Sequence, residues 1–180
     1  MRGCPVCESK EVYKITSIPL SLPNGMDFFD SYNLIRCEIC GFFYADLLGD
    51  QNDLDQYYFN DSKYETIEIQ SVGGGGVTQQ DKIRLSKTFN LIEPYLNINS
   101  RILDIGTANG GLLKVFKDNG FHFLTGVEPA KECCLNTIEL VGCTCYNNSF
   151  INQEFNQKFD FISVTHVLEH VLDVKSFMNK

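Results

Sequence analysis

ILDIGTANGG, at residues 102–111, is the stretch that decides the fold of this chain. Its apolar run carries one acid, Asp104, and gives way to small residues and glycines before a helical pattern starts at Leu112. This order predicts a buried strand, a tight turn and a helix start. Small residues let backbone N–H groups approach a ligand, and the helix N-terminus adds unpaired donors. The turn is therefore a candidate cofactor cradle with four contact residues: Gly106, Thr107, Ala108 and Gly110.

A second acid, Glu128, follows the predicted strand 122–127. At the tip of a neighbouring strand an acid can accept both ribose hydroxyls of a dinucleotide or an adenosyl ligand. Asp104 favours the adenosyl ligand, because an acid there would repel a pyrophosphate and attract an ammonium. S-adenosylmethionine (SAM) carries an ammonium and a sulfonium. A dehydrogenase stays open as an alternative, because the turn also has the spacing of a weakened dinucleotide fingerprint.

Three motifs in the same order resemble the class I SAM-dependent methyltransferases: LDIGTANGG at 103–111, VEP at 127–129 and FDFISVTHVLEHV at 159–171. The resemblance covers roughly residues 99–173 and implies SAM as the methyl donor. Ala108 stands where the family usually has its middle glycine. After the third strand, the family often has an acid and a neighbour that touch adenine. That place is occupied here by Asn148, Ser149 and Phe150. The side-chain amide of Asn148 can still hydrogen-bond the exocyclic amine of adenine.

The pattern around these motifs alternates between strands and helices. An amphipathic helix is predicted over 78–96. It is followed by strand 101–105, helix 111–119, strand 122–127, helix 130–141, strand 143–146 and strand 159–164. This alternation with short connections predicts an α/β fold, a partial doubly wound parallel sheet of the Rossmann-like, class I methyltransferase type. Two further pairs of cysteines, the adjacent Cys133 and Cys134 and the alternate Cys143 and Cys145, fall within this pattern and are expected to pack as small apolar residues.

Two CxxC pairs lie near the N-terminus: Cys4 with Cys7, and Cys37 with Cys40. Each pair places two sulfurs on one side of a tight turn, and four thiolates make a closed tetrahedral zinc site without an open catalytic position. We therefore expect structural zinc in a small zinc-ribbon-like domain that gains much of its folding free energy from the metal. Free thiols or two redox pairs are the alternatives, although the setting of a redox pair is absent.

The chain before residue 78 carries further local signals. A strand is predicted over 12–18 and a return strand over 34–36, with turns at the intervening prolines. Aromatics cluster within 47–64, either to close over a substrate or, more simply, to pack the zinc unit onto the next domain. Four consecutive glycines at 73–76 predict a linker. The expected domains are 1–72 with zinc and an aromatic connector, the linker 73–77, and the methyltransferase part 78–180.

Composition limits the kinds of partner. The formal charge of -8 argues against a nucleic-acid groove, which needs clustered Lys and Arg. The sequence contains no secretory h-region and no long apolar run, so we expect a cytoplasmic protein with reduced thiols and no membrane partner. A small-molecule substrate follows as the expectation.

The segment after strand 159–164 carries the candidate catalytic groups. Ligands in open parallel sheets sit beyond the carboxyl ends of the strands, so Thr165 and His166 should border the methyl donor. His166 is the expected general base, because imidazole titrates near neutral pH, and Glu169 or His170 would orient it or bind substrate. The alternative is that His166 only shapes the pocket while the other two cap a helix. An HxxEH zinc site is a further alternative, but it needs a helix and another ligand.

A CxxC pair of knuckles before such a domain looks like the sugar C-methyltransferases that act on keto-deoxysugar nucleotides. That resemblance implies a nucleotide-linked hexulose as acceptor. Small-molecule O-methyltransferases and zinc-bearing ribosomal-RNA methyltransferases are the alternatives. Class I sheets have more strands than this chain supplies, so we also expect an unpaired sheet edge that can associate. An incomplete chain, acting as a noncatalytic module that binds zinc and the cofactor, is the hypothesis of another class.

Overall fold

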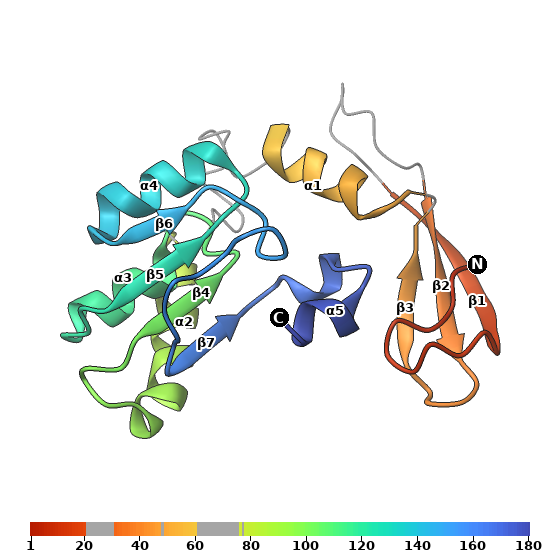
Figure 1. Ribbon diagram of the computed structural model, residues 1–180, viewed down its shortest axis with the longest axis horizontal. Coiled ribbons are helices and arrows are strands. Elements are labelled where there is room, and N and C mark those ends of the chain that lie inside the picture. The colour runs from red at the N-terminus through yellow and green to blue at the C-terminus, as the bar shows by residue number, and fades with distance from the viewer. Residues whose placement is uncertain (21–30, 48, 61–75, 77) are drawn as a thin grey trace. The chain divides into compact units, whose positions relative to one another are not determined.

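The computed structural model describes residues 1–20, 31–47, 49–60, 76 and 78–180 (Figure 1). The chain forms two compact units. The first combines Met1–Tyr57 with Leu168–Lys180, and the second is Tyr58–Val167. The expected linker falls mostly at 73–75 and 77, outside the described residues, so the domain bounds at 72 and 78 stay a prediction.

The second unit is built on a parallel sheet of four strands: β4 (Ile102–Ile105), β5 (Leu124–Val127), β6 (Thr144–Tyr146) and β7 (Phe161–Val164). The strand order is β6-β5-β4-β7, and all three pairings are parallel. All four residues of β4 and of β5 are buried, as expected for strands covered on both faces. The predicted α/β, Rossmann-like fold is confirmed.

Three helices accompany this sheet: α2 (Gln79–Ile92), α3 (Gly111–Asp118) and α4 (Lys131–Val141). The helix expected over 78–96 ends earlier, because Pro94 starts a 3-10 turn at Glu93–Tyr95 (η1). A capping box between Thr78 and Asp81 fixes its start. The core includes a cluster of aromatic rings in edge contact, made by Phe89, Phe116 and Phe121.

The first unit contains an antiparallel sheet in the order β1-β2-β3. Its strands are β1 (Val12–Pro19), β2 (Ser31–Cys37) and β3 (Phe43–Asp46). Its helical elements are α1 (Gln51–Asn60) as far as Tyr57, the 3-10 turn η2 (Leu168–His170) and α5 (Val174–Met178). Its buried core cluster consists of Cys4, Ile35, Cys37 and Tyr44. So small an apolar core gives little folding free energy without a cross-link or metal.

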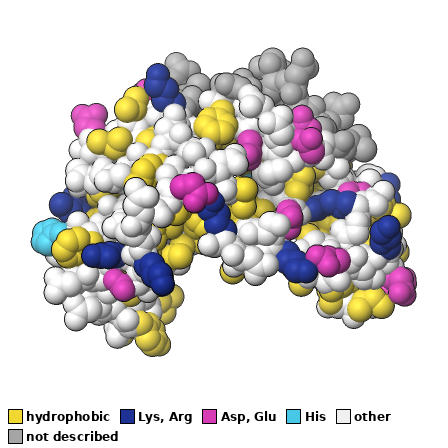
Figure 2. Space-filling view, viewed as in Figure 1, with side chains coloured by type: hydrophobic (Ala, Val, Ile, Leu, Met, Phe, Trp, Pro, Cys, Tyr) yellow, Lys and Arg dark blue, Asp and Glu magenta, His cyan; other side chains and the backbone are white. Residues whose placement is uncertain are grey.

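The surface carries both acidic and basic side chains, as the composition predicts (Figure 2). Figure 2 shows basic and acidic side chains interspersed over the face that it presents. In the part of the chain that the structure describes, each helix is too short or too polar to cross a bilayer.

Candidate functional site

The two acids singled out from the sequence lie at the carboxyl ends of adjacent strands. Asp104 of β4 pairs in register with Gly126 of β5, and Glu128 comes directly after β5. Residues two apart along a strand share a face, so Glu128 lies on the same face as Asp104, with Cα atoms about 8 Å apart on ordinary strand spacings. The backbone N–H of Glu128 still donates to Tyr146 O at 3.0 Å, which continues the ladder beyond β5.

Asp104 is a buried acid with one strong donor. It is 2% exposed, and Ser163 Oγ of the adjacent strand β7 donates to Asp104 Oδ1 at 2.6 Å. Burial raises the pKa of Asp104 to about 6, against the lowering effect of the hydroxyls of Ser163 and Thr107. A buried carboxylate of this kind gains most from a cationic ligand, which would restore its ionised form.

Thr107 places a second polar group at this turn. Its hydroxyl is near enough to Asp104 to lower the pKa of that acid, yet no described residue makes a hydrogen bond of good geometry with the buried Oγ1 atom. Buried hydroxyls are almost always bonded. A polar ligand at this turn would satisfy it.

Glu128 is held by the turn that it faces. Its Oε2 accepts from Ala108 N at 2.8 Å, and its Oε1 accepts from Ala130 N at 3.0 Å. A carboxylate has about four lone-pair sites, so both oxygens can still accept from ribose hydroxyls. Ala108 adopts φ 48, the left-handed region that glycine tolerates best. Ala108 therefore keeps the left-handed backbone that its hydrogen bond to Glu128 uses, although the residue is not a glycine.

The glycines of the turn serve internal packing first. A Cβ on Gly106 would lie 2.4 Å from Val167 Cγ2, and one on Gly110 would lie 2.9 Å from Thr137 Oγ1. A Cβ on Gly111 would lie 2.1 Å from the carbonyl oxygen of Gly76. The turn that is predicted to contact a ligand is therefore also the place where Val167, Thr137 of α4 and Gly76 approach the glycine backbone closely.

The residues expected near adenine follow β6 directly. Asn148 Oδ1 accepts from Ser149 N at 2.9 Å, and its Nδ2 donates to Gln153 Oε1 at 3.3 Å. Phe150 lies 6.1 Å from the ring of Phe155, in a tilted contact. This hydrogen bonding orders the segment, and Phe150 packs against Phe155.

His166 has an unusual backbone. It follows the end of β7 by two residues, adopts φ 57 and is exposed, while its neighbour Thr165 is half-buried. A bulky residue in the left-handed region costs of order 1–3 kcal/mol, and such residues cluster at functional sites. Glu169 and His170 are exposed and lie in η2, a 3-10 turn of the first unit. The helix that an HxxEH zinc site needs is therefore replaced by a 3-10 turn.

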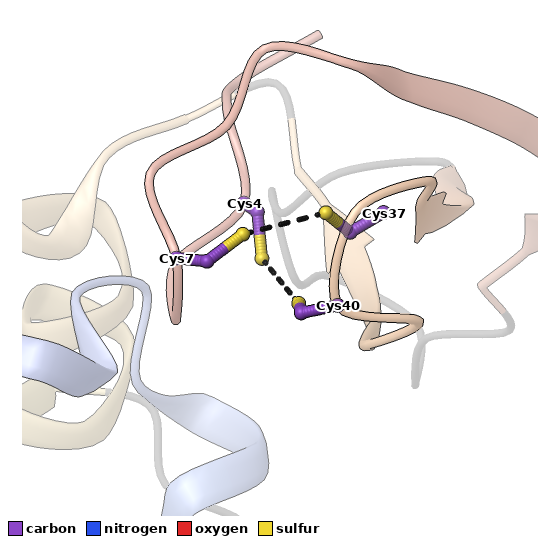
Figure 3. A group of neighbouring side chains, drawn as sticks. All are labelled: Cys4, Cys7, Cys37 and Cys40. Atoms are coloured by element: carbon purple, nitrogen blue, oxygen red, sulfur yellow. Dashed lines mark hydrogen bonds between the residues drawn. The ribbon is translucent and has the colours of Figure 1, made fainter.

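The four N-terminal cysteines come together as predicted (Figure 3). Their sulfurs all lie within 4.8 Å of one another, with Cys4 Sγ 3.6 Å from Cys40 Sγ and Cys7 Sγ 3.5 Å from Cys37 Sγ. Zn–S bonds of about 2.3 Å in a tetrahedron put the sulfurs about 3.8 Å apart. The cluster fits a closed zinc site, and within the described residues it is the one group of this kind.

The two knuckles have equivalent backbones. The residue after the second cysteine of each pair has a positive φ, 62 at Glu8 and 73 at Gly41. Backbone N–H groups of Cys40 and Ile39 bond the sulfur of Cys37 and lower its pKa to about 7, against the effect of burial. Amides that favour the thiolate in this way are typical of a zinc knuckle.

The remaining cysteines behave as the sequence predicts. Cys133 and Cys134 are buried, and Cys143 and Cys145 are half-buried. Burial raises the pKa of Cys143 to about 11 and raises that of Cys145 as well. Such thiols are inert at neutral pH.

Sequence reasoning missed two residues that shape the site: Ser163 and Val167. Ser163 could have been found from strand register, because it lies opposite Asp104. The packing of Val167 on Gly106 carries no sequence signal.

Comparison with known proteins agrees with this geometry. A family model described as a methyltransferase domain matches residues 78–180. Magnesium protoporphyrin IX methyltransferase from Synechocystis PCC 6803 with bound SAH is similar in fold, with a TM-score of 0.54 at 12% identity over 68% of this chain and 61% of that chain. The same enzyme with bound SAM gives 0.53 at 13% identity, over 69% and 65%. The chain thus spans less than two thirds of these structures. No curated protein matches it in sequence.

Proposed function

Because the chain belongs to the methyltransferase domain family, we propose that it binds SAM beyond the carboxyl ends of β4 and β5 and serves methyl transfer to a small molecule. The observation that carries the proposal is the placement of Asp104 and Glu128 on one face of adjacent strand ends. The buried hydroxyl of Thr107, which lacks a bond to the described residues, supports it.

SAM would supply a methyl group on a sulfonium, which an acceptor takes by in-line displacement. The chain's part is to align the two reactants and to exclude water. Asp104 would bind the ammonium and Glu128 the ribose hydroxyls. The segment of Asn148, Ser149 and Phe150 would lie along adenine, and Thr107 with the backbone of the turn would hold the polar tail.

His166 is our choice for the general base. Its exposed imidazole at the carboxyl end of β7 can take a proton from a hydroxyl or from a carbon beside a carbonyl. Glu169 and His170 would assist in orienting the base or the acceptor. The strained backbone at His166 supports this role, because such strain is retained where function requires it.

For the acceptor we propose a nucleotide-linked keto-deoxysugar, methylated at carbon. Support comes from the four-cysteine unit that precedes the methyltransferase domain, and from the charge of -8, which disfavours an RNA groove. In this proposal residues 1–72 form the zinc-binding domain and 78–180 part of the methyltransferase domain. Zinc on the four cysteines would be structural, because four thiolates leave no open position.

The test of cofactor binding is calorimetric titration of the zinc-loaded full chain with S-adenosylhomocysteine (SAH). We expect binding that Asp104→Asn and Glu128→Gln abolish and that Asp118→Asn, an exposed acid of α3, leaves unchanged. Absence of binding to folded, zinc-loaded protein would contradict the proposal and favour a noncatalytic module. Binding of a nicotinamide dinucleotide in its place would favour a dehydrogenase.

The base and the acceptor are tested together in deuterium oxide. A keto-deoxysugar nucleotide with an acidic carbon next to its ketone should exchange that proton for deuterium in the presence of SAH. His166→Ala should slow the exchange by about 10²–10⁴-fold, the usual contribution of a general base, while SAH affinity is kept. Exchange at the wild-type rate in this variant would remove His166 from the mechanism.

A further inference from the structure

Within the first unit, the C-terminal segment is held against the N-terminal part through both backbone groups of one residue, Leu172. Leu172 N donates to Gln51 Oε1 at 2.9 Å, and Leu172 O accepts from the guanidinium nitrogen Nη1 of Arg2. Leu172 lies two residues after His170, at the other end of the chain from Arg2. The conformation of the segment 168–173 therefore depends on partners outside the segment itself.

Arg2 connects this segment to the four-cysteine knuckle. Its Nη2 donates to Ala45 O at 2.9 Å, and its guanidinium lies over the ring of Tyr44, 5.0 Å from the centroid. Tyr44 OH in turn donates to Arg2 O at 2.7 Å. Tyr44 belongs to the same buried cluster as Cys4 and Cys37. The guanidinium is thus oriented in part by Tyr44, which lies in one buried cluster with two of the sulfur ligands.

We propose that Arg2 is a positioning residue that transmits the folding of the zinc knuckle to the segment 168–173, and so sets the conformation of Glu169 and His170. The importance of those two side chains for the acceptor rests on the proposed function, whereas the coupling does not. Arginine suits this task because its planar fork presents donors to two carbonyl oxygens at once, whereas a lysine ammonium acts as a single point. The ion pair between Lys175 and Glu8 joins the same parts but is exposed, and such pairs contribute little.

The test is hydrogen–deuterium exchange of the zinc-loaded full chain. Loss of a charged hydrogen bond in Arg2→Ala should raise the exchange rate of the peptide containing residues 168–173 about tenfold, while peptides of β1 and β2, which the Arg2 side chain does not bond, exchange as in the wild type. Lys175→Ala is the matched control, and we expect its exchange to be unchanged. Unchanged exchange at 168–173 in Arg2→Ala that retains its zinc would overturn the proposal.

A second readout follows His170 directly. The chain has three histidines, so the ring C–H spectrum is simple enough to assign each of them. The signal of His170 should move in Arg2→Ala and on chelation of zinc, while that of His122, which lies in the second unit, stays in place. A His170 signal that ignores both changes would count against the coupling.

Arg2→Lys covers the case in which Arg2→Ala loses zinc. It keeps the charge, so zinc should remain bound, but exchange at 168–173 should lie between that of the wild type and that of Arg2→Ala. Wild-type exchange in Arg2→Lys would show that the fork is unnecessary and would overturn the assignment. SAH titration of the same samples separates the two proposals, because failure to bind SAH would contradict the function and leave the exchange result standing.

Discussion

Ser163 donates its hydroxyl proton to Asp104 across the β4–β7 pair, with 2.6 Å between Ser163 Oγ and Asp104 Oδ1. The bond joins the central acid of the proposed cofactor site to an edge strand of the sheet. It stabilises the ionised form of Asp104, whereas burial favours the protonated form and dominates. The balance between these two effects makes Asp104 sensitive to pH and to a cationic ligand.

Asp104→Asn should raise the free energy of unfolding at pH 8. The pKa of Asp104 is about 6 in the native state, above its ordinary value of 3.8. The native state therefore holds its proton more tightly than the unfolded state, and stability falls as pH rises from about 4 to about 6. Above that window the ionised acid costs about 2–3 kcal/mol, which an isosteric amide removes. Urea unfolding at pH 4 and pH 8 measures the difference.

The gain in the free energy of unfolding that Asp104→Asn brings should shrink towards zero at pH 4, where Asp104 is protonated in the native state. Asp118→Asn on the surface of α3 provides the control, and its stability should follow that of the wild type at both pH values. If Asp104→Asn has a lower free energy of unfolding than the wild type at pH 8, the ionised Asp104 stabilises the fold, and the prediction is wrong.

SAH affinity should fall with acidification. The ligand's ammonium requires the ionised form of Asp104, so below pH 6 binding must expel a proton, and Kd should rise by up to about tenfold per pH unit. Ser163→Ala removes the donor that favours the carboxylate and should move the onset of this fall to higher pH. Calorimetry between pH 5 and 8 in two buffers of different ionisation enthalpy measures both effects. A pH-independent Kd would contradict ammonium binding by Asp104.

Cobalt substitution should report four thiolate ligands. The zinc-free protein loaded with Co²⁺ should show intense thiolate-to-metal charge transfer in the ultraviolet and tetrahedral ligand-field bands in the visible, because four sulfurs lie within 4.8 Å. Cys37→Ser should weaken both. Cys143→Ser, in the other unit, should leave the spectrum unchanged. A spectrum of octahedral type would contradict the site.

Replacing Ala108 by glycine and Gly110 by alanine should change the free energy of unfolding in opposite directions. Ala108→Gly relieves a positive φ of 48 and should stabilise by about 0.5–1 kcal/mol. Gly110→Ala introduces a Cβ 2.9 Å from Thr137 Oγ1 at φ 78 and should destabilise by about 2 kcal/mol or more. Urea unfolding measures both. Equal effects of the two substitutions would contradict the packing described for the turn.

The sequence predicts the second unit well because its elements carry local signals. Buried parallel strands are continuous apolar runs, and β4, β5, β6 and β7 each lie within a predicted range. Helix α4 begins one residue after its predicted start and ends at the predicted residue, where Gly142 takes a left-handed cap. The positions of Asp104 and Glu128 follow from the predicted strands, because each acid lies near or directly after the carboxyl end of its strand.

The first unit is less visible in the sequence. Helix α1 was not predicted, because Leu54 is the buried apolar residue on an otherwise polar and aromatic stretch. Strand β3 is too short for alternation to be recognised. The contact of Arg2 with Leu172 joins residues separated by 170 positions, and no local pattern records such a pair. The cysteines were found because ligand spacing is itself a local signal.

The division of the chain into units has a consequence for synthesis. The first unit contains Met1–Tyr57 but also Leu168–Lys180, so its C-terminal segment leaves the ribosome only after strands β4 to β7 have been translated. Domains otherwise tend to fold in the order in which they emerge. The cysteine knuckle can capture its metal early, whereas Arg2 must wait for Leu172, so completion of the first unit follows the translation of β4 to β7.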